Sequence, residues 1–340
     1  MTTTRRWGPA NRIASIGASL SMALVTACSA AGPSGPTDTA ARSATPVPTL
    51  GATSTPVAKS TPRPPSAIVG ELDAGGAGWA MTKAGGALWI QVDAPVDAIV
   101  RIDATTGSAA PAVPLGWKPK FGTEGLWVVC CDWLVRVDPA TGEELIRVPM
   151  GGALALGDGA AWLANETGLY RINAETGEVG EPIAPGVGSA CANRHDLAIA
   201  FASAWLACKV EGQVVRIDLA TGEQTDIATA AGPNRLTVTE EAVWVTNYEA
   251  GSVSRIDPRT NGVTTVDGAG RDPGITNGGG YVWAATPTGI AKIDPTTVSI
   301  VGELDLGPGQ YYELVWDDGI IWVSTRGSRV LKVDTAAGLP

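Results

Sequence analysis

The sequence is poor in the residues and motifs that usually mark a catalytic or metal centre. It has one histidine, His195, among 340 residues, which excludes an HExxH motif and any cluster of several histidines. It contains no Walker loop, no G-x-S-x-G elbow, no EF-hand loop and no C-x-x-C pair. We therefore expect no resident metal and no resident cofactor.

Basic residues are also scarce relative to acidic ones. The chain has 24 lysines and arginines against 34 aspartates and glutamates, a net charge of −10. Loss of residues 1–27 removes three arginines and no acid, which leaves 21 against 34 and a charge of −13. Such a body disfavours nucleic acid and anionic lipid surfaces as partners.

No long segment has helical periodicity, but one strand pattern occurs seven times. A strand such as Val243-Trp244-Val245-Thr246 is followed by a second strand that ends in a basic residue, an apolar residue and Asp or Asn. Intervals of 35 to 43 residues separate the tryptophans, which are Trp89, Trp127, Trp162, Trp205, Trp244, Trp283 and Trp322. Repeats of this length, made only of short strands, are typical of β-propeller blades with four strands each.

The alternation within each repeat assigns its side chains. We expect the tryptophans to pack between neighbouring blades. The recurring basic residues, from Arg101 and Arg136 to Lys332, are expected to pair with nearby carboxylates rather than to bind a polyanion. The third and fourth strands meet at Asp-x-x-Thr-Gly, as in Asp103–Gly107, where Asp can bond the backbone ahead and Gly supplies a positive φ.

The two ends of the chain predict how the ring closes. The seventh repeat stops after its third strand, while Ile68-Val69-Gly70-Glu71-Leu72-Asp73 repeats Ile300-Val301-Gly302-Glu303-Leu304-Asp305, the fourth strand of blade six. We expect residues 67–74 to complete blade seven and so protect an open sheet edge. The predicted fold is all-β, a seven-bladed propeller over residues 67–340.

These residues carry a family resemblance. The Val-Trp-Val-Thr-Asn strand at 243–247 and the Arg-Ile-Asp…Thr-x-Gly ending resemble the YVTN and streptogramin-lyase-like group of seven-bladed propellers. The resemblance covers about residues 67–340 and implies the architecture. Streptogramin lyases of this group use a histidine and a glutamate with a magnesium ion on the loop rim, and His195 is the histidine available here. Because one fold hosts many functions, the activity does not follow from the resemblance.

The first 66 residues differ in composition. Arg5, Arg6 and Arg12 precede an apolar run that ends in Leu24-Val25-Thr26-Ala27-Cys28, which resembles a bacterial lipobox. We expect a signal segment over 1–27, lipidation of Cys28, and a Pro-, Ser-, Thr- and Ala-rich disordered tether over 28–66. The alternative is ordinary secretion with cleavage nearby. The predicted location is the outer face of a bacterial membrane, reached through the lipid anchor only.

The loops around the central opening of a propeller are the natural place for a site, because loops on a rigid scaffold commonly carry function. Residues that precede each inner strand and those in the second-to-third strand loops should share one rim. The expected ligand-binding residues are Trp79, Trp117, Lys118, Asp196, Asn234, Arg235, Tyr312, Tyr248 and Trp133. If the protein is an enzyme, His195 with Glu313 or Glu166 are the candidate acid and base.

Four cysteines remain beside Cys28. Cys191 enters blade four and Cys208 ends its second strand, so both should reach the rim and export favours a Cys191–Cys208 disulfide. Cys130 and Cys131 are adjacent and either form a vicinal disulfide or stay reduced. A four-thiolate metal site is disfavoured, since the two pairs belong to blades two and four.

Three functions follow from this reading. The first is a non-catalytic binding or scaffold module that engages an envelope protein or a small ligand through the rim, as a monomer. The second is a metal-assisted lyase or hydrolase, the only case in which magnesium is expected. The third is a sensor or accessory subunit of an envelope complex.

Overall fold

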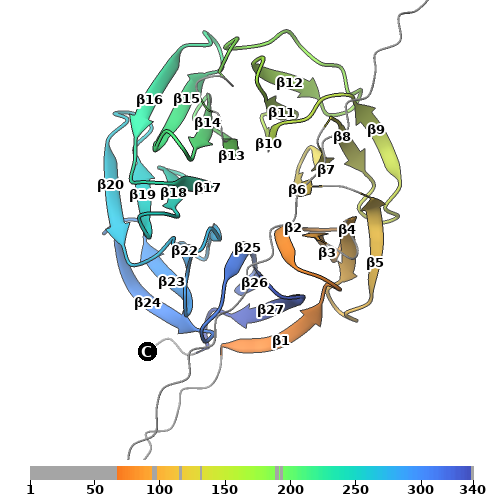
Figure 1. Ribbon diagram of the computed structural model, residues 1–340, viewed down its shortest axis with the longest axis vertical. Helices are drawn as coiled ribbons and strands as arrows, with labels where there is room; N and C mark the ends of the chain where they lie inside the picture. The colour runs from red at the N-terminus through yellow and green to blue at the C-terminus, as the bar shows by residue number, and fades with distance from the viewer. Residues whose placement is uncertain are drawn as a thin grey trace, which may run out of the picture. The chain divides into compact units, whose positions relative to one another are not determined.

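The computed structural model describes residues 67–93, 98–114, 117–130, 132–187, 191 and 194–337. The predicted signal segment, Cys28 and the tether lie outside the described residues. The described chain is entirely strands and turns, and none of it forms a helix long and apolar enough to cross a membrane. Its strands form seven small sheets arranged as a ring, which confirms the predicted seven-bladed propeller (Figure 1).

Blades one to three follow one another along the chain, each from its innermost strand outward. Blade one comprises β2 (Gly78–Ala84), β3 (Ala87–Val92), β4 (Ala98–Asp103) and β5 (Ala109–Pro114). Blade two comprises β6 (Trp117–Gly122), β7 (Gly125–Val129), β8 (Leu134–Val137) and β9 (Glu144–Val148). Blade three comprises β10 (Ala153–Gly157), β11 (Ala160–Ala164) and β12 (Leu169–Asn173).

Blades four to six repeat the same order. Blade four comprises β13 (Arg194–Ala200), β14 (Ser203–Cys208), β15 (Gln213–Asp218) and β16 (Gln224–Ala228). Blade five comprises β17 (Pro233–Val238), β18 (Val243–Asn247), β19 (Ser252–Ile256) and β20 (Val263–Asp267). Blade six comprises β21 (Ile275–Gly278), β22 (Tyr281–Thr286), β23 (Gly289–Asp294) and β24 (Ser299–Asp305).

Blade seven is made from both ends of the propeller. It comprises β25 (Tyr311–Asp317), β26 (Ile320–Thr325), β27 (Arg329–Asp334) and β1 (Ile68–Asp73). β1 pairs antiparallel with β27, with Leu72 opposite Val330, and lies on the outside of the blade (Figure 1). The expected closure by residues 67–74 is therefore confirmed, and β27 is not left as an open edge.

The seven tryptophans lie in the second strand of their blades and are buried. Six donate their indole N–H to an oxygen at the turn before that strand, as Trp205 does to the Ala200 carbonyl at 3.0 Å. The seventh, Trp322, donates to the Asp317 carboxylate at 3.3 Å. Each ring buries a large apolar surface and keeps its one polar atom paired, so the row is structural, as expected.

The row of basic residues has different partners from those expected. Each one lies directly opposite a tryptophan in the strand register, as Arg216 does opposite Trp205. The Arg216 guanidinium lies over that ring at 5.1 Å and donates to the Pro258 carbonyl and to Asn261 Oδ1 of the next blade at 2.6 and 2.9 Å. No member of the row forms an ion pair within the described chain. The expectation of carboxylate partners was wrong in that no such ion pair forms; Arg216 instead contacts the tryptophan ring of its own blade and two oxygens of the next blade.

The Asp-x-x-Thr-Gly turns have the expected geometry. Asp218 Oδ1 accepts hydrogen bonds from the N–H groups of Ala220 and Thr221, and Gly222 has a φ of +73°. Blade six has Val298 at the glycine position with a φ of +52°. The turn is therefore determined by the Asp or Asn side chain that begins it, as at Asn173 in blade three, and glycine only lowers its cost.

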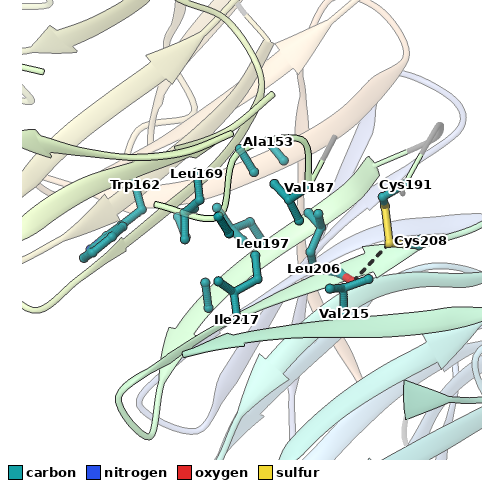
Figure 2. Close-up of a cluster of buried hydrophobic side chains, with 14 of the residues drawn as sticks. Ala153, Trp162, Leu169, Val187, Cys191, Leu197, Leu206, Cys208, Val215 and Ile217 are labelled. Carbon is teal, nitrogen blue, oxygen red and sulfur yellow. Dashed lines mark hydrogen bonds between the residues drawn. A yellow bond between two sulfur atoms is a disulfide. The ribbon is translucent and has the colours of Figure 1, made fainter. Parts of the chain in front are cut away.

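Blade three departs from the pattern of four strands. After β12 the described chain forms only two isolated bridges, Leu169 with Ile183 and Ile172 with Val179. The segment instead packs inward, where Ala184 and Val187 join the apolar cluster between blades three and four (Figure 2). The disulfide between Cys191 and Cys208 lies at the end of this cluster, with the two Cα atoms 5.1 Å apart.

Candidate functional site

Five of the seven inner strands have a register shift near their rim ends. The register shifts between Gly78 and Met81 in β2, and at matching places in β6, β13, β17 and β25. A β-bulge of this kind bends a strand and re-aims its side chains. The bulges fall at the residues that the sequence places on the rim, so the strand register changes where the candidate site lies.

One ion pair links blade two to blade four. Lys120 Nζ of β6 lies 3.1 Å from Asp196 Oδ1 of β13, and the Asp196 side chain is almost fully buried. Asp196 Oδ2 accepts a hydrogen bond from the backbone N–H of Leu236 in β17 at 3.1 Å. Burial acts to raise the pKa of Asp196, but the charges of Lys120, Arg235 and Lys118 outweigh it and hold the pKa below its ordinary value.

A second ion pair links blade five to blade seven. Arg235 Nη2 of β17 lies 3.4 Å from Glu313 Oε2 of β25, and both side chains are largely buried. Burial raises the pKa of Glu313, and the opposing pull of Arg235 and Lys120 does not cancel the rise. Both ion pairs join blades that are not neighbours, so they lie across the central opening, which the inner strands line (Figure 1).

Lys118 of β6 completes this group. Burial and the nearby positive charge of Arg235 lower its pKa to about 8, against the pull of Asp196 and Glu313. Its backbone has a φ of +39°, which belongs to the bulge of β6. We call Lys118, Lys120, Asp196, Arg235 and Glu313 the central charge cluster.

Aromatic residues lie beside the central charge cluster. Trp79 of β2 and Tyr312 of β25 are stacked, with ring centroids 4.4 Å apart and planes tilted by 33°. The Trp79 indole N–H donates to Asp93 Oδ2, and the Tyr312 hydroxyl donates to Gln310 Oε1 at 3.2 Å. Trp79 is 36% exposed, so the pair presents an apolar surface at the junction of blades one and seven. We call Trp79 and Tyr312 the aromatic pair.

An acidic residue that sequence reasoning did not single out lies in the loop entering blade six. Asp272 is 6% exposed, and its Oδ2 has no hydrogen-bond partner. Burial raises the pKa of Asp272 to about 6, although a hydrogen bond from the Tyr311 backbone acts in the opposite direction. Its charge also acts to raise the pKa of Tyr311 and of Tyr312, the first two residues of β25.

The other expected ligand-binding residues have different surroundings. Asn234 is buried next to Arg235 on β17. Tyr248 is 38% exposed at the end of β18, with Lys209 Nζ 4.9 Å from its ring centroid. The Trp133 ring is covered by Arg147 of the outer strand β9 at 4.7 Å, which places it away from the inner strands. Trp117 begins β6, and its side chain lies outside the described residues.

The candidate acid and base residues are not all brought together. Glu313 belongs to the central charge cluster, whereas Glu166 is exposed in the turn between β11 and β12 of blade three. His195 lies at the bulge of β13, directly before Asp196, and its side chain lies outside the described residues. The arrangement therefore associates Glu313, and not Glu166, with the inner strands.

Two residues of this region could have been found from the sequence with a finer rule. Lys120 lies two residues after Lys118, so period-two alternation places both on one face of β6. Asp272 precedes the Pro273-Gly274 pair that enters blade six, one residue before the positions counted back from the tryptophan. No sequence signal locates the bulges, because they depend on how each inner strand meets its neighbour.

The cysteines do not offer a thiolate metal site in the described chain. Cys191 and Cys208 form the expected disulfide, so the nearby carboxylate of Glu211 has no thiolate beside it. Cys130 is buried at the end of β7, while Cys131 lies outside the described residues, as does the vicinal pairing considered for them.

A separate cavity of about 400 Å³ lies between blades five and six. It is lined by Arg255, Asn277 and Tyr281, together with the turn residues Thr239 to Glu241 that follow β17. That turn is at the end of β17 opposite the rim, so this cavity does not belong to the central opening. Arg255 Nε, like Arg235 Nε, is buried without a hydrogen-bond partner.

Comparison with known proteins gives the class of the protein. No protein-family model and no curated protein sequence matches the chain. Among solved structures, virginiamycin B lyase from Staphylococcus aureus is similar, with a TM-score of 0.63, 16% identity, and coverage of 78% of this chain and 98% of that chain. BamB from Moraxella catarrhalis is similar with a TM-score of 0.53, 13% identity, and coverage of 76% and 84%.

A third similar structure is the extracellular domain of BT4673 from B. thetaiotaomicron, with a TM-score of 0.63, 13% identity, and coverage of 81% of this chain and 42% of that chain. At these identities the likeness shows the fold alone. The protein is thus a seven-bladed β-propeller similar in fold to streptogramin B lyases.

Proposed function

We propose that the protein is an extracytoplasmic, lipid-anchored binding module that takes its ligand at the central opening. One observation carries the proposal: Asp196 and Arg235 of the central charge cluster are buried, and the two ion pairs that they form with half-buried Lys120 and Glu313 join non-adjacent blades. Burying charges usually costs more free energy than their pairing returns, so a cluster of this kind is weak evidence for a stabilising role. Recognition of a polar ligand explains why a protein would keep these charges despite the free-energy cost of burying them.

The aromatic pair supports the same proposal. Tyr312 is adjacent to Glu313 in β25, so the apolar surface of the pair and the charges of the cluster share one strand. Exposed, rigid aromatic side chains next to buried polar groups are the usual composition of a binding hot spot. In this proposal the aromatic pair provides apolar contact area for the ligand, and the charged groups of the cluster fix the ligand's orientation.

The location and partner are part of the proposal. Cys28 with the apolar run before it supports lipid anchoring, and the acidic body supports a monomer that touches the membrane through its lipid alone. The partner is an envelope protein or a small molecule, and not nucleic acid. A role as sensor or accessory subunit is a form of the same binding function, in which the ligand is another protein.

A thermal-shift series on the purified protein tests the proposal. The panel holds envelope sugars, lactone antibiotics, divalent metals and a chelator. A ligand that binds only the folded protein stabilises it by about 2.7 kcal/mol at a hundredfold excess over its dissociation constant. We expect a shift that is lost in Tyr312→Ala and kept in Tyr170→Ala, a tyrosine outside the central opening. A shift that both variants keep would place binding elsewhere.

A lyase is the second candidate, because Glu313 lies at the opening with a raised pKa. Burial is the main cause of that rise, and such a carboxyl suits general acid chemistry. Among the similar structures is a catalytically inactive histidine variant of virginiamycin B lyase with quinupristin. In this candidate His195 and Glu313 act with magnesium on a lactone. Ring opening of a streptogramin B lactone, lost in His195→Ala and Glu313→Gln, tests it by mass spectrometry.

A further inference from the structure

The cavity between blades five and six lies at an interface that hydrogen bonds fill one step earlier in the ring. Between blades four and five, Arg216 Nη1 donates to the Pro258 carbonyl and to Asn261 Oδ1 at 2.6 and 2.9 Å. The basic residue at the same place in blade five is Arg255, opposite the tryptophan of its own blade. Arg255 lines the cavity, so the two interfaces can be compared residue by residue.

Arg255 lacks the contacts that Arg216 has. It is half-buried, its Nε is buried with no hydrogen-bond partner, and among the described residues its guanidinium forms no ion pair and no ring contact. Val298 occupies the place in blade six that Asn261 has in blade five, so the side-chain oxygen that Arg216 uses has no counterpart. A buried donor without an acceptor is costly, and a ligand with two oxygens would replace the missing contacts.

Other groups in the cavity wall suit a positive charge. Glu240 and Glu241, in the turn between β17 and β18, line the cavity, are exposed and form no ion pair within the described chain. Asn277 Nδ2 of β21 donates to Thr237 Oγ1 and to the Val238 carbonyl at 2.7 and 2.9 Å, which leaves its Oδ1 as an acceptor. The two carboxylates and this oxygen favour an ammonium group and disfavour a ligand that is only anionic.

We propose that this cavity binds a small zwitterion, a free amino acid or a dipeptide, with its carboxylate on Arg255 and its ammonium group towards Glu240 and Glu241. A planar guanidinium pairs with a carboxylate through two parallel hydrogen bonds. A cavity of about 400 Å³ is within the size range of small-molecule sites. The site is separate from the central opening, so this inference goes beyond the function proposed there and does not depend on it.

The test follows thermal unfolding of the full protein at neutral pH, with L-alanine and L-alanyl-L-alanine as the zwitterions. Two blocked dipeptides are the comparisons. N-acetyl-L-alanyl-L-alanine lacks the ammonium group, and L-alanyl-L-alanine amide lacks the carboxylate. We expect at least one zwitterion to raise the midpoint with a saturable dependence on concentration, and each blocked dipeptide to bind more weakly. The absence of a saturable shift with either zwitterion contradicts the proposal.

Arg255→Gln should weaken binding of the zwitterion by at least about tenfold, the value of one charge-assisted hydrogen bond. Arg101→Gln is the matched control, because Arg101 has the same place in blade one and its Nε is also buried without a hydrogen-bond partner. We expect this control to bind as the wild type does. A shift of equal size in all three proteins is the general effect of a cosolute and overturns the proposal.

Val298→Asn tests the cause of the missing contact without removing a charge. Asn261 has a φ of +59° and Val298 a φ of +52°, so asparagine suits this backbone conformation. We expect the substitution to give Arg255 an acceptor of the kind that Arg216 has, and thus to weaken binding of the zwitterion. Binding as tight as that of the wild type would show that the ligand does not replace this acceptor.

The blocked dipeptides test the two charges separately. If the N-acetyl dipeptide binds as tightly as the zwitterion, the site takes a carboxylate alone and the assignment is wrong. If the amide binds as tightly, Arg255 takes a neutral carbonyl and the assignment is also wrong. Glu240→Gln combined with Glu241→Gln should weaken binding of the zwitterion and not that of the N-acetyl dipeptide, because only the zwitterion carries an ammonium group.

Tyr312→Ala distinguishes this site from the central opening. The substitution should leave the response to the zwitterion unchanged, whatever it does to a ligand at the central opening. A response that is lost in Tyr312→Ala and kept in Arg255→Gln would place the zwitterion at the central opening and overturn this inference, while the proposed function would stand.

Discussion

At the scale of single residues, Asp272 is a buried acid that the fold does not fully accommodate. One carboxylate oxygen has no partner, and burial raises its pKa to about 6, with only the Tyr311 N–H acting in the other direction. A raised carboxyl pKa means that the folded state binds the proton more tightly than the unfolded state does. Its contribution is therefore favourable below the unfolded pKa near 4 and is lost as pH rises through about 6.

Asp272→Asn should therefore stabilise the protein at pH 8 by about 1–3 kcal/mol, since the amide keeps an oxygen for the Tyr311 N–H and carries no charge. The advantage should vanish near pH 4, where the wild-type carboxyl is protonated. Urea unfolding of both proteins across this range measures it. A variant that is equally stable or less stable at pH 8 would show that the carboxylate has a partner in solution.

The basic row gives a second prediction at this scale, with a control inside the protein. Arg216 lies over Trp205 and donates to two oxygens of blade five, whereas Arg171, at the same place in blade three, is exposed. We expect Arg216→Ala to lower the free energy of unfolding by about 1–3 kcal/mol and Arg171→Ala by less than about 0.5 kcal/mol. Urea unfolding compares them, and equal losses would mean that the inter-blade hydrogen bonds contribute little.

At the scale of elements, β1 decides whether the ring is closed. Its burial alternates, with Leu72 turned toward the cluster that holds Trp322 and Val330 and Val69 53% exposed. Leu72→Asn should cost about 1–3 kcal/mol, because it places an amide against apolar side chains, while Val69→Asn should be nearly neutral. Thermal unfolding measures both. If neither variant changes the midpoint, β1 contributes little to the stability of the blade.

The same elements show what could be predicted from the sequence and what could not. The tryptophan spacing and the Asp-x-x-Thr-Gly turns specify strand order locally, and the repeat of Ile300–Asp305 at Ile68–Asp73 specifies closure. The hydrogen-bond partners of Arg216 were missed because they belong to the next blade, and the pattern within one repeat carries no information about the neighbouring one. The missing fourth strand of blade three was missed for a similar reason: residues 184–187 gain more by packing against blade four.

The candidate site was predicted less completely than the fold. Counting back from each tryptophan located Lys118, Asp196, Arg235 and Glu313, because the repeat length is nearly constant. It gave no indication that Lys120 pairs with Asp196 or Arg235 with Glu313, since those contacts join blades that are not adjacent in the ring. The spacing of the repeats predicted which residues lie near the central opening. It did not predict which of them form ion pairs, because that depends on the β-bulges of the inner strands.

At the scale of the whole molecule, the disulfide links the segment that leads into blade four to the second strand of that blade. Cys191 and Cys208 are 17 residues apart and close a loop at the cluster between blades three and four (Figure 2). A loop of that length is worth about 3 kcal/mol in the chain-entropy account. Cys191→Ala/Cys208→Ala should therefore unfold at lower urea than the oxidised wild type. Reductant should lower the wild-type midpoint and leave the variant unchanged; a reductant effect of equal size in both would assign it to other cysteines.

The two ion pairs across the opening also connect distant parts of the molecule, because each joins two blades that are not neighbours in the ring. Asp196→Asn leaves Lys120, Lys118 and Arg235 facing Glu313 alone, so we expect a loss of about 3–5 kcal/mol, the usual cost of breaking a buried pair. Asp196→Asn combined with Lys120→Met removes both partners and should recover part of that loss. Because the pKa of Asp196 is held below its ordinary value, the contribution of the pair is present above the unfolded pKa near 4 and is lost as pH falls through the folded pKa.

The double-mutant cycle separates two roles for the central charge cluster. If the double variant recovers most of the stability that Asp196→Asn loses, the ring is held by its blades and does not require the Lys120–Asp196 pair. If the double variant stays 3–5 kcal/mol below the wild type, on the scale of a broken buried pair, the pair itself holds blades two and four together. Urea unfolding of the wild type, the two single variants and the double variant at neutral pH distinguishes these outcomes. We expect the first, because the free energy lost in desolvating two charges usually offsets most of what their pairing returns.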